Sequence, residues 1–283
     1  MDTPEHTDRP NRAWHVRRIV TAGALLAACA CVVEPPKGPL AWKPDRRVAG
    51  AVAPGATMVL LDSGTPAMRL AWTPERWPDD PLACAGTFVA AHGRGDTVYA
   101  VWRTGRDSSR SEVRLARSAN AGLEWDPPIT PVAGDPAPAG CSRPAPAIAS
   151  DTAASAVHVV FHGRADGHTG LFVSSLNSTT ATFGLPLIVS MGDRPVPAAI
   201  AATGDTIAVV FEAPANATGV MWLAISVGPR HIQTVHEVLS GRGVRVFSPG
   251  VALGGGWVGA AWNEARQGND APTAVARVGR WVR

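Results

Sequence analysis

Two arginines and five other polar residues occupy matching positions in this sequence and could together form a polar face that binds a ligand. Arg143 and Arg194 each stand three positions before a recurrent proline. A guanidinium group can hold a carboxylate through two parallel hydrogen bonds. The other five follow four regularly spaced aromatic residues, and they are Arg103, His162, Glu212, Asn263 and Glu264. We expect these seven residues to form a polar ligand-binding face; the alternative is that they only cap strand ends.

Other reactive groups of residues are incomplete. His236 and Glu237 begin like a zinc-protease helix, but Ser240 stands where the second histidine ligand is needed. His158 and His162 would lie roughly 13 Å apart on one strand, at ~3.3 Å per residue, which is too far to bind one metal ion. We interpret both as surface histidines. The sequence therefore predicts neither a metal site nor a cofactor.

A repeat of about fifty residues would supply the elements that position this face. Pro146, Pro197 and Pro249 open similar segments and lie 51 and 52 positions apart. Each opening is followed by a turn and a short apolar run that ends in an aromatic residue. The aromatic residues are Phe161, Phe211 and Trp262, and an earlier copy of the same apolar run ends in Trp102. Repeats of this length indicate a fold that is assembled from one supersecondary unit.

Each repeat contains up to four short apolar segments separated by turn residues. The second segments cover residues 98–102, 157–161, 207–211 and 257–262, and the third cover 112–116, 171–175, 220–226 and 273–278. Fourth segments are visible at 129–132, 187–190 and 232–239. Four short strands joined by tight turns form the blade of a β-propeller. We predict an all-β propeller of about five four-stranded blades over residues 46–283. Residues 48–77 would form an irregular first blade, and an N-terminal strand would complete the last blade and close the ring.

One turn between the third and fourth segments of its repeat carries a recognisable motif. Residues 118–125 read Ser-Ala-Asn-Ala-Gly-Leu-Glu-Trp. This segment resembles the Asp-box (BNR repeat) of sialidase-like propellers, with Ser118, Asn120, Gly122 and Trp125 at the motif positions. Asn120 stands in place of the aspartate and Glu124 in place of a threonine. The motif stabilises a turn, so the resemblance implies a fold and no catalytic role.

Sialidases of this family cleave with an arginine triad, a tyrosine nucleophile paired with a glutamate, and an aspartate acid/base. This chain has one tyrosine, Tyr99, which lies inside a predicted strand. Alternation along that strand predicts that Tyr99 is a packed or half-exposed residue. We therefore expect no sialidase activity, and whether any other enzyme activity exists stays open.

The N-terminus predicts export. Four arginines precede a ten-residue apolar run at 19–28, which is shorter than the about 20 residues that a membrane span needs. The run ends in Leu-Ala-Ala-Cys, which resembles a bacterial lipobox with Cys29 as the lipidated residue. Ordinary cleavage after residue 30 is the alternative. We expect a signal peptide at 1–28 outside the fold, a proline-rich tether at 29–45, and a place in the cell envelope, at the outer membrane in a Gram-negative cell. Secretion or a periplasmic location is the alternative.

Two further cysteines precede the first strands of neighbouring repeats. Cys84 and Cys141 lie 57 positions apart. First strands line the axis of a propeller, so equivalent points on adjacent blades approach one another, and exported proteins meet oxidising conditions. We predict a disulfide between them; two buried free thiols are the alternative.

Composition narrows the functions that the propeller could serve. The net charge is only +3 and the arginines are scattered, which does not favour nucleic acid as a partner. We expect a lipid-anchored envelope protein whose non-catalytic propeller binds a carbohydrate or an envelope or extracellular protein. A divergent exo-glycosidase of the sialidase type and a purely structural subunit are the alternatives.

Overall fold

The computed structural model divides the chain into two compact units, Met1–Pro36 and Lys37–Arg283. The residues that it describes all belong to the second unit, and they are 40–49, 56–60, 66–70, 72–105, 111–132, 141–153, 155–204, 206–213, 220–227, 235–241, 243–266 and 271–281. The predicted signal peptide and the lipidation at Cys29 lie outside these residues.

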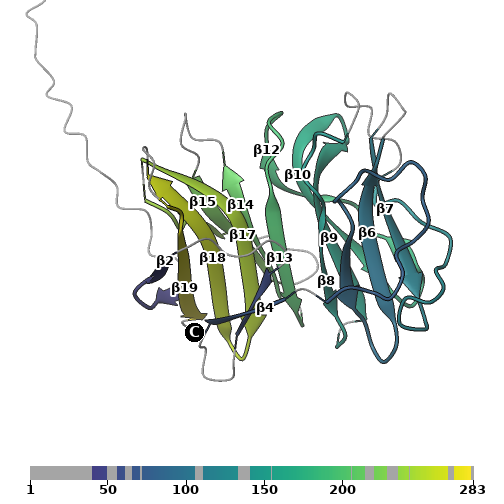
Figure 1. The fold of residues 1–283 in the computed structure, drawn as a ribbon, viewed down its shortest axis with the longest axis horizontal. Coiled ribbons are helices and arrows are strands. Elements are labelled where there is room, and N and C mark those ends of the chain that lie inside the picture. The colour runs from purple at the N-terminus through teal and green to yellow at the C-terminus, as the bar shows by residue number, and fades with distance from the viewer. Residues whose placement is uncertain are drawn as a thin grey trace, which may run out of the picture. The chain divides into compact units, whose positions relative to one another are not determined.

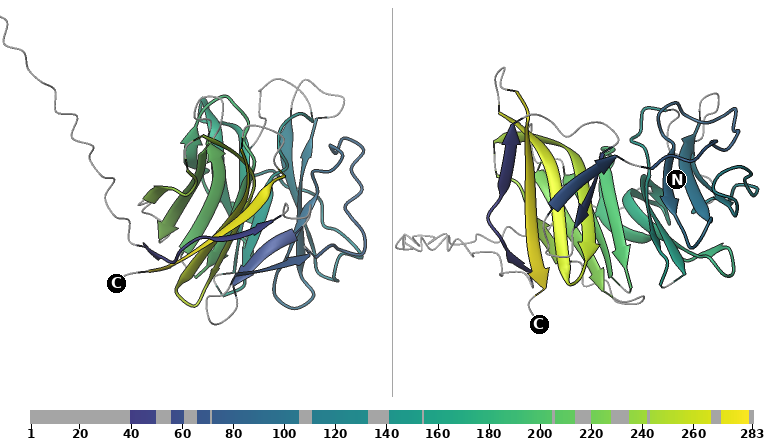
Figure 2. Two further views of the ribbon diagram at one scale, coloured as in Figure 1. Left: turned by 60° about the vertical axis from the view of Figure 1, so that its left-hand side comes forward. Right: turned by 60° about the horizontal axis from the view of Figure 1, so that its bottom comes forward.

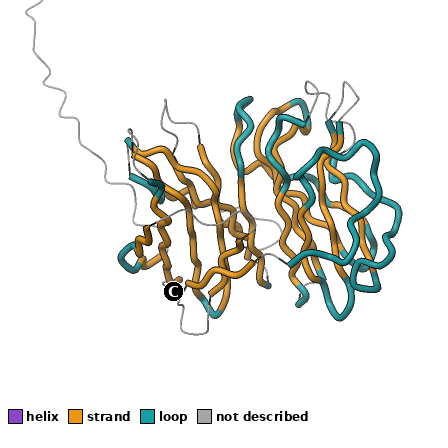
Figure 3. Tube along the Cα trace, in the orientation of Figure 1, coloured by secondary structure: helices purple, strands orange, loops and turns teal. Residues whose placement is uncertain are grey.

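Every regular element in the described ranges is a β-strand (Figure 3). Among these residues, no helix is long and apolar enough to cross a membrane. In chain order, the strands are β1 (Leu40–Trp42), β2 (Arg46–Ala49), β3 (Ala56–Leu60), β4 (Pro66–Leu70), β5 (Val89–His92), β6 (Val98–Thr104), β7 (Glu112–Ser118), β8 (Ala147–Asp151), β9 (Ala156–Ala165), β10 (His168–Asn177), β11 (Thr182–Phe183), β12 (Leu187–Met191), β13 (Ala198–Thr203), β14 (Thr206–Ala213), β15 (Val220–Val227), β16 (Val235–Val238), β17 (Val244–Gly254), β18 (Trp257–Arg266) and β19 (Thr273–Trp281).

The strands form antiparallel sheets in which sequential strands are neighbours (Figure 1). The order β13-β14-β15-β16 makes one complete blade. The preceding sheet follows β8-β9-β10, with both β11 and β12 paired to β10. Before that comes β5-β6-β7, whose fourth strand is reduced to a single bridge between Leu115 and Ile129. The predicted second and third strands are thus confirmed, whereas the fourth strand expected at 129–132 is only that bridge. The described chain has the all-β, blade-by-blade arrangement of a β-propeller.

The apolar runs are nearly continuous because each middle strand packs on both of its faces. Along β14, Ala208 and Val210 belong to one apolar core, whereas Val209 and Phe211 belong to the next. Strand side chains point alternately to opposite faces, so consecutive residues face different neighbouring sheets. The cores therefore lie between blades, and this stacking fixes how the strand ends meet at one rim.

The last blade is completed by the beginning of the described chain. Strands β1 and β2 both pair with β19, in a sheet that follows β17-β18-β19. Figure 2 shows these purple N-terminal strands beside the yellow C-terminal strand. The predicted N-terminal strand is confirmed. Leu40–Trp42 fell within the predicted tether, however, and this boundary is corrected: Leu40 is buried in the core of the last two blades and so belongs to the fold.

The first blade is the least complete in the described chain. Strands β3 and β4 form a two-stranded sheet, whose Met58 packs on Ala252 and Ala261 of the last blade. After this hairpin, Trp72 contacts His92 of β5, with ring centroids 4.0 Å apart. The hairpin thus packs on the last blade, and the segment that follows it reaches the second blade through Trp72. Because the hairpin supplies only two strands, the predicted number of five four-stranded blades is not established.

Candidate functional site

Arg103 lies at the predicted rim but is wholly buried. From the end of β6 it donates hydrogen bonds to the backbone oxygens of Pro144, at 3.4 Å, and His162, at 2.8 Å, and to the hydroxyl of Ser111, at 3.1 Å. Pro144 and His162 belong to the next blade. Arg103 therefore joins two blades. Arg143, beside Pro144, is buried as well.

The two strand histidines are buried, so their interpretation as surface residues is wrong. His162 Nε2 lies 3.0 Å from the backbone oxygen of Gly192, which precedes the following blade. His158 Nδ1 lies 2.8 Å from the hydroxyl of Ser175. Burial lowers the pKa of His158, and the nearby charge of Asp151 opposes that shift. Both rings are buried because β9 packs between two neighbouring sheets.

Asn263 and Glu264 at the end of β18 are also buried. Glu264 accepts hydrogen bonds from the indole nitrogen of Trp262 at 2.9 Å and from Arg47 of β2 at 2.6 Å. This carboxylate therefore holds the N-terminal strand in the last blade. Its two oxygens are both engaged within the protein.

Glu212, Arg194 and Arg245 form the part of the rim that is accessible to a ligand. Glu212 ends β14 and is half-buried, whereas Arg194 before β13 and Arg245 at the start of β17 are exposed. Burial raises the pKa of Glu212, and the positive charges of Arg194 and Arg245 lower it. Electrostatic influence of this kind requires that the three groups lie near one another. Arg194 and Glu212 were predictable from the repeat, whereas Arg245 lies outside the repeated positions and was not.

Tyr99 lies at the opposite end of its strand from the rim. It is 4% exposed and packs in the core between the second and third blades. Four positions separate it from Arg103, which corresponds to roughly 13 Å along a strand. The predicted packing of Tyr99 is confirmed, and the position offers no nucleophile to a ligand at the rim.

The turn at residues 118–125 is held by its own side chains. The Ser118 hydroxyl accepts a hydrogen bond from the backbone of Gly122 at 2.9 Å, and Asn120 Oδ1 accepts one from the backbone of Glu124 at 2.9 Å. Gly122 has φ +92°, and a Cβ there would lie 2.7 Å from Pro74 Cβ. The indole nitrogen of Trp125 donates to the backbone oxygen of Arg76 at 3.1 Å. Asn120 can thus perform the turn-forming role of an aspartate, while the Asp-box assignment stays an interpretation.

Cys84 and Cys141 form a disulfide, with Cα atoms 5.2 Å apart. Cys84 is fully buried, and its backbone nitrogen donates to the Arg103 oxygen at 2.7 Å. Cys141 lies two positions before Arg143. The bond therefore ties the second and third blades together next to the buried arginine that bridges them.

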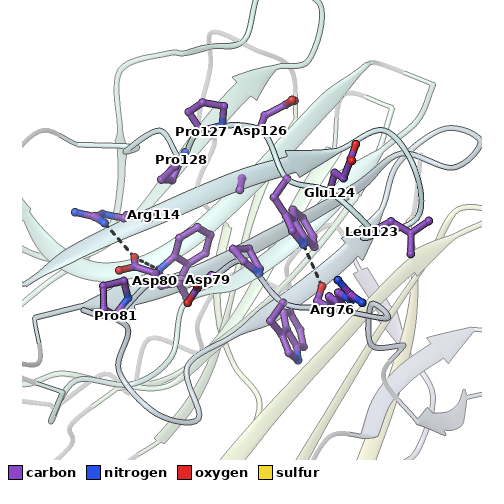
Figure 4. Close-up of a pocket in the computed structure, with 15 residues that line it drawn as sticks. Arg76, Asp79, Asp80, Pro81, Arg114, Leu123, Glu124, Asp126, Pro127 and Pro128 are labelled. Atoms are coloured by element: carbon purple, nitrogen blue, oxygen red, sulfur yellow. Dashed lines mark hydrogen bonds and ion pairs between the residues drawn. The ribbon is translucent and has the colours of Figure 1, made fainter.

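A groove of about 540 Å³ lies on the face of β6 and β7 that points away from the third blade (Figure 4). Trp77 and Trp125 line it, together with four prolines, four carboxylates and two arginines. Asp80 accepts hydrogen bonds from the indole of Trp102 at 2.7 Å and from Arg114 at 3.0 Å. This groove was not predictable from the sequence, because its walls come from irregular segments without a periodic pattern.

In the described ranges, no group of three histidine, cysteine or carboxylate side chains has a geometry that could hold a metal ion. His236 and Glu237 lie on strand β16, not on a zinc-protease helix.

No family model and no curated protein matches this chain. Solved structures with similar folds include a phage phi92 endosialidase, with 9% identity over 78% of this chain and 39% of that one at a TM-score of 0.48. A xylan β-1,4-xylosidase from Bacillus halodurans is 11% identical, and the match covers 81% of this chain and 53% of the xylosidase at a TM-score of 0.45. A glycoside hydrolase is 12% identical over 74% of each chain, at a TM-score of 0.42. The chain thus spans about half of the xylosidase and less of the endosialidase, and likeness at this level concerns the fold and assigns no activity.

Proposed function

We propose that this is an exported protein whose propeller binds an acidic carbohydrate at its rim. The observation that carries the proposal is the placement of two exposed arginines, Arg194 and Arg245, beside the half-buried Glu212. The remaining rim residues that the sequence singled out are buried, and several hold neighbouring blades together. The accessible residues among those singled out are therefore Arg194 and Glu212, with Arg245 beside them.

The chemistry of these three groups suits a sugar that carries a carboxylate. Each guanidinium can donate two parallel hydrogen bonds to a carboxylate. Glu212 can accept hydrogen bonds from neighbouring sugar hydroxyls, and it partly balances the two positive charges. A carboxylate and a hydroxyl on one ring would then meet complementary partners. A neutral sugar would leave the arginines without a charged partner.

Binding is tested with a galacturonate tetramer, using calorimetry and a neutral galactose oligomer for comparison. Removal of either guanidinium, in Arg194→Ala or Arg245→Ala, is expected to weaken binding of the acidic tetramer about tenfold, the equivalent of ~1.4 kcal/mol. Arg280→Ala is the matched control, because Arg280 is also exposed but pairs with Trp257 at the other end of its sheet. Unchanged affinity in a variant lacking both rim arginines would contradict the proposal.

A second candidate is glycoside hydrolysis, and the raised pKa of Glu212 favours it. A general acid that works near neutral pH needs such a shift. Glycosidases also need a second carboxylate about 5–10 Å away, and the neighbouring Glu264 is occupied by Trp262 and Arg47. The protein should be assayed on a panel of chromogenic glycosides. Turnover that disappears in Glu212→Gln while binding persists would establish an enzyme, and absence of turnover would leave a binding module.

We further propose that the protein is anchored through a lipid on Cys29, at the outer membrane in a Gram-negative cell. The support is the Leu-Ala-Ala-Cys sequence behind a short apolar run. A lipid-anchored propeller would present its rim to glycans of the cell envelope. An unanchored periplasmic or secreted protein would have the same binding chemistry, so the location is tested separately.

A further inference from the structure

The groove on β6 and β7 differs from the surfaces between the other sheets. One face of this sheet packs on the third blade through Val101 and Leu115. The opposite face carries Ala100, Trp102 and Ala116, and the partly buried side chains packed on it belong to Trp77, Ala83, Phe88 and Trp125. No side chain of another described sheet enters that cluster. The volume of about 540 Å³ falls in the range of small-ligand sites, roughly 300–1,000 Å³.

The aromatic walls of the groove are fixed before any ligand arrives. The hydrogen bond from Trp125 to the Arg76 backbone holds one indole, and packing against Phe88, with ring centroids 5.4 Å apart, holds Trp77. Pro78 and Pro128 are among the four prolines of the walls, and proline restricts backbone rotation. A rigid site pays less conformational entropy when it binds.

Carboxylates outnumber guanidinium groups in the lining of the groove by four to two, and Arg76 is the arginine that is exposed there. The indole nitrogens of Trp102 and Trp125 already donate to protein oxygens, and Arg114 is paired with Asp80. Asp79 and Glu124 are exposed carboxylates, and Asp126, which pairs with Arg117 at 3.3 Å, keeps 59% of its side chain exposed. Figure 4 shows Asp126 and Asp80 on opposite sides of the opening. The excess of carboxylates therefore favours a ligand that supplies donors or positive charge over one that carries negative charge.

We infer that this groove binds an oligosaccharide that is neutral or carries amino groups. Sugar rings present flat apolar faces that can stack on indoles, and hydroxyl or ammonium groups that can donate to carboxylates. This site goes beyond the proposed rim, from which it differs in charge: the rim attracts acidic sugars and the groove repels them.

The test uses the purified full chain with a glucosamine tetramer and cellotetraose, and reads tryptophan fluorescence and calorimetry. Either or both tetramers should bind. Trp125→Ala and Trp77→Ala should each weaken binding about tenfold, and Trp125→Phe should retain most of the affinity because it keeps an aromatic face. A double variant of the exposed carboxylates, Asp79→Asn with Glu124→Gln, should weaken the glucosamine tetramer most. Asp166→Asn, an exposed carboxylate in the turn between β9 and β10, is the matched control.

Competition separates this inference from the proposed function. The galacturonate tetramer should not displace the glucosamine tetramer, and either site can therefore fail while the other holds. Failure of both neutral and amino tetramers to bind at millimolar concentration would overturn the inference. So would full binding in the carboxylate double variant, in Trp125→Ala and in Trp77→Ala. Binding of a proline-rich peptide that is lost in Trp77→Ala, without binding of either sugar, would assign the groove to a peptide partner instead.

Discussion

Arg103 and Arg194 carry the same guanidinium group at the same rim, but they lie in different environments. Arg103 is fully buried and donates hydrogen bonds to three groups, two of which belong to the next blade. Arg194 is exposed and acts on Glu212 through its charge. The first arginine therefore contributes to stability, and the second is free to meet a ligand.

Replacement of Arg103 should destabilise the fold strongly. Arg103→Ala removes the donor from the buried backbone oxygen of His162 and from the partly buried one of Pro144, and an unsatisfied buried group costs about 1–3 kcal/mol. We expect the free energy of unfolding to fall by about 3 kcal/mol in urea titrations. Arg194→Ala, the control at the exposed position, should change it by less than about 0.5 kcal/mol. Equal effects of the two substitutions would contradict this division of roles.

Glu237 should make stability fall as the pH rises. Burial raises its pKa above the ordinary 4.5, against the hydrogen bond from Trp42 and the charge of Arg277. Between pH 4.5 and the raised pKa, the unfolded state has released this proton while the folded state still holds it. Unfolding is therefore increasingly favoured across that window. Urea midpoints measured from pH 4 to 8 should decline less in Glu237→Gln than in the parent chain, and parallel profiles would refute the assignment.

At the scale of elements, the closing strands β1 and β2 depend on a few long-range contacts. Arg277 of β19 donates two hydrogen bonds to Asp45, at 2.6 and 3.1 Å, across 232 positions of sequence. Lys43 lies 4.2 Å from the ring centroid of Trp257. Gly279 has no side chain, and a Cβ there would lie 2.8 Å from the indole of Trp42. These contacts hold β1 and β2 against β19, whose edge would otherwise be open.

Loss of the Asp45–Arg277 pair should loosen this closure. Asp45→Ala is expected to lower the free energy of unfolding by about 2 kcal/mol, since hydrogen bonds to charged groups contribute about 1.5–3 kcal/mol. It should also increase self-association in size-exclusion chromatography, because the exposed edge of β19 can pair with another chain. Arg46→Ala, an exposed position on the same segment, should do neither. A monomeric Asp45→Ala protein of parental stability would show that the pair is dispensable.

The strands were predictable from the sequence because their positions repeat. The rim residues were only partly predictable. The run before Phe211 is continuously apolar because both faces of β14 are covered by neighbouring sheets, and such a run is easily recognised as a strand in the sequence. The same repeat placed Arg103 and Arg194 at one rim, but it could not distinguish the buried arginine from the exposed one. That difference depends on Pro144 and His162 of another blade. The groove was not predictable, because Trp77 and Trp125 lie in separate irregular segments.

At the scale of the molecule, the disulfide joins two blades that also share an apolar core. Its 57-position loop predicts a stabilisation of about 4 kcal/mol relative to the reduced chain. The Cys84→Ser, Cys141→Ser double variant should therefore unfold at lower temperature. Reduction of the parent should lower its mobility on a denaturing gel and free two thiols for alkylation. Equal mobility, with both thiols already reactive before reduction, would disprove the bond.

Anchoring is likewise a property of the whole chain, and it is tested in cells. Cys29→Ser should move the protein from the membrane fraction to the soluble one, because the lipid acceptor is lost. Cys31→Ser is the matched control, since it removes a neighbouring thiol that lies outside the lipobox. Membrane retention of Cys29→Ser, with the mature N-terminus found elsewhere, would disprove lipidation.

The pairing of β1 and β2 with β19 has a consequence for how the protein matures. Leu40 meets Trp281 in the same sheet, so the final sheet cannot form until almost the whole described chain has emerged. Until β19 is available, β1 and β2 have no partner strand. A chain that stopped before β19 would therefore keep these edges open, and open edges favour pairing with another chain. The last strand of the sheet thus decides whether its first strands are protected.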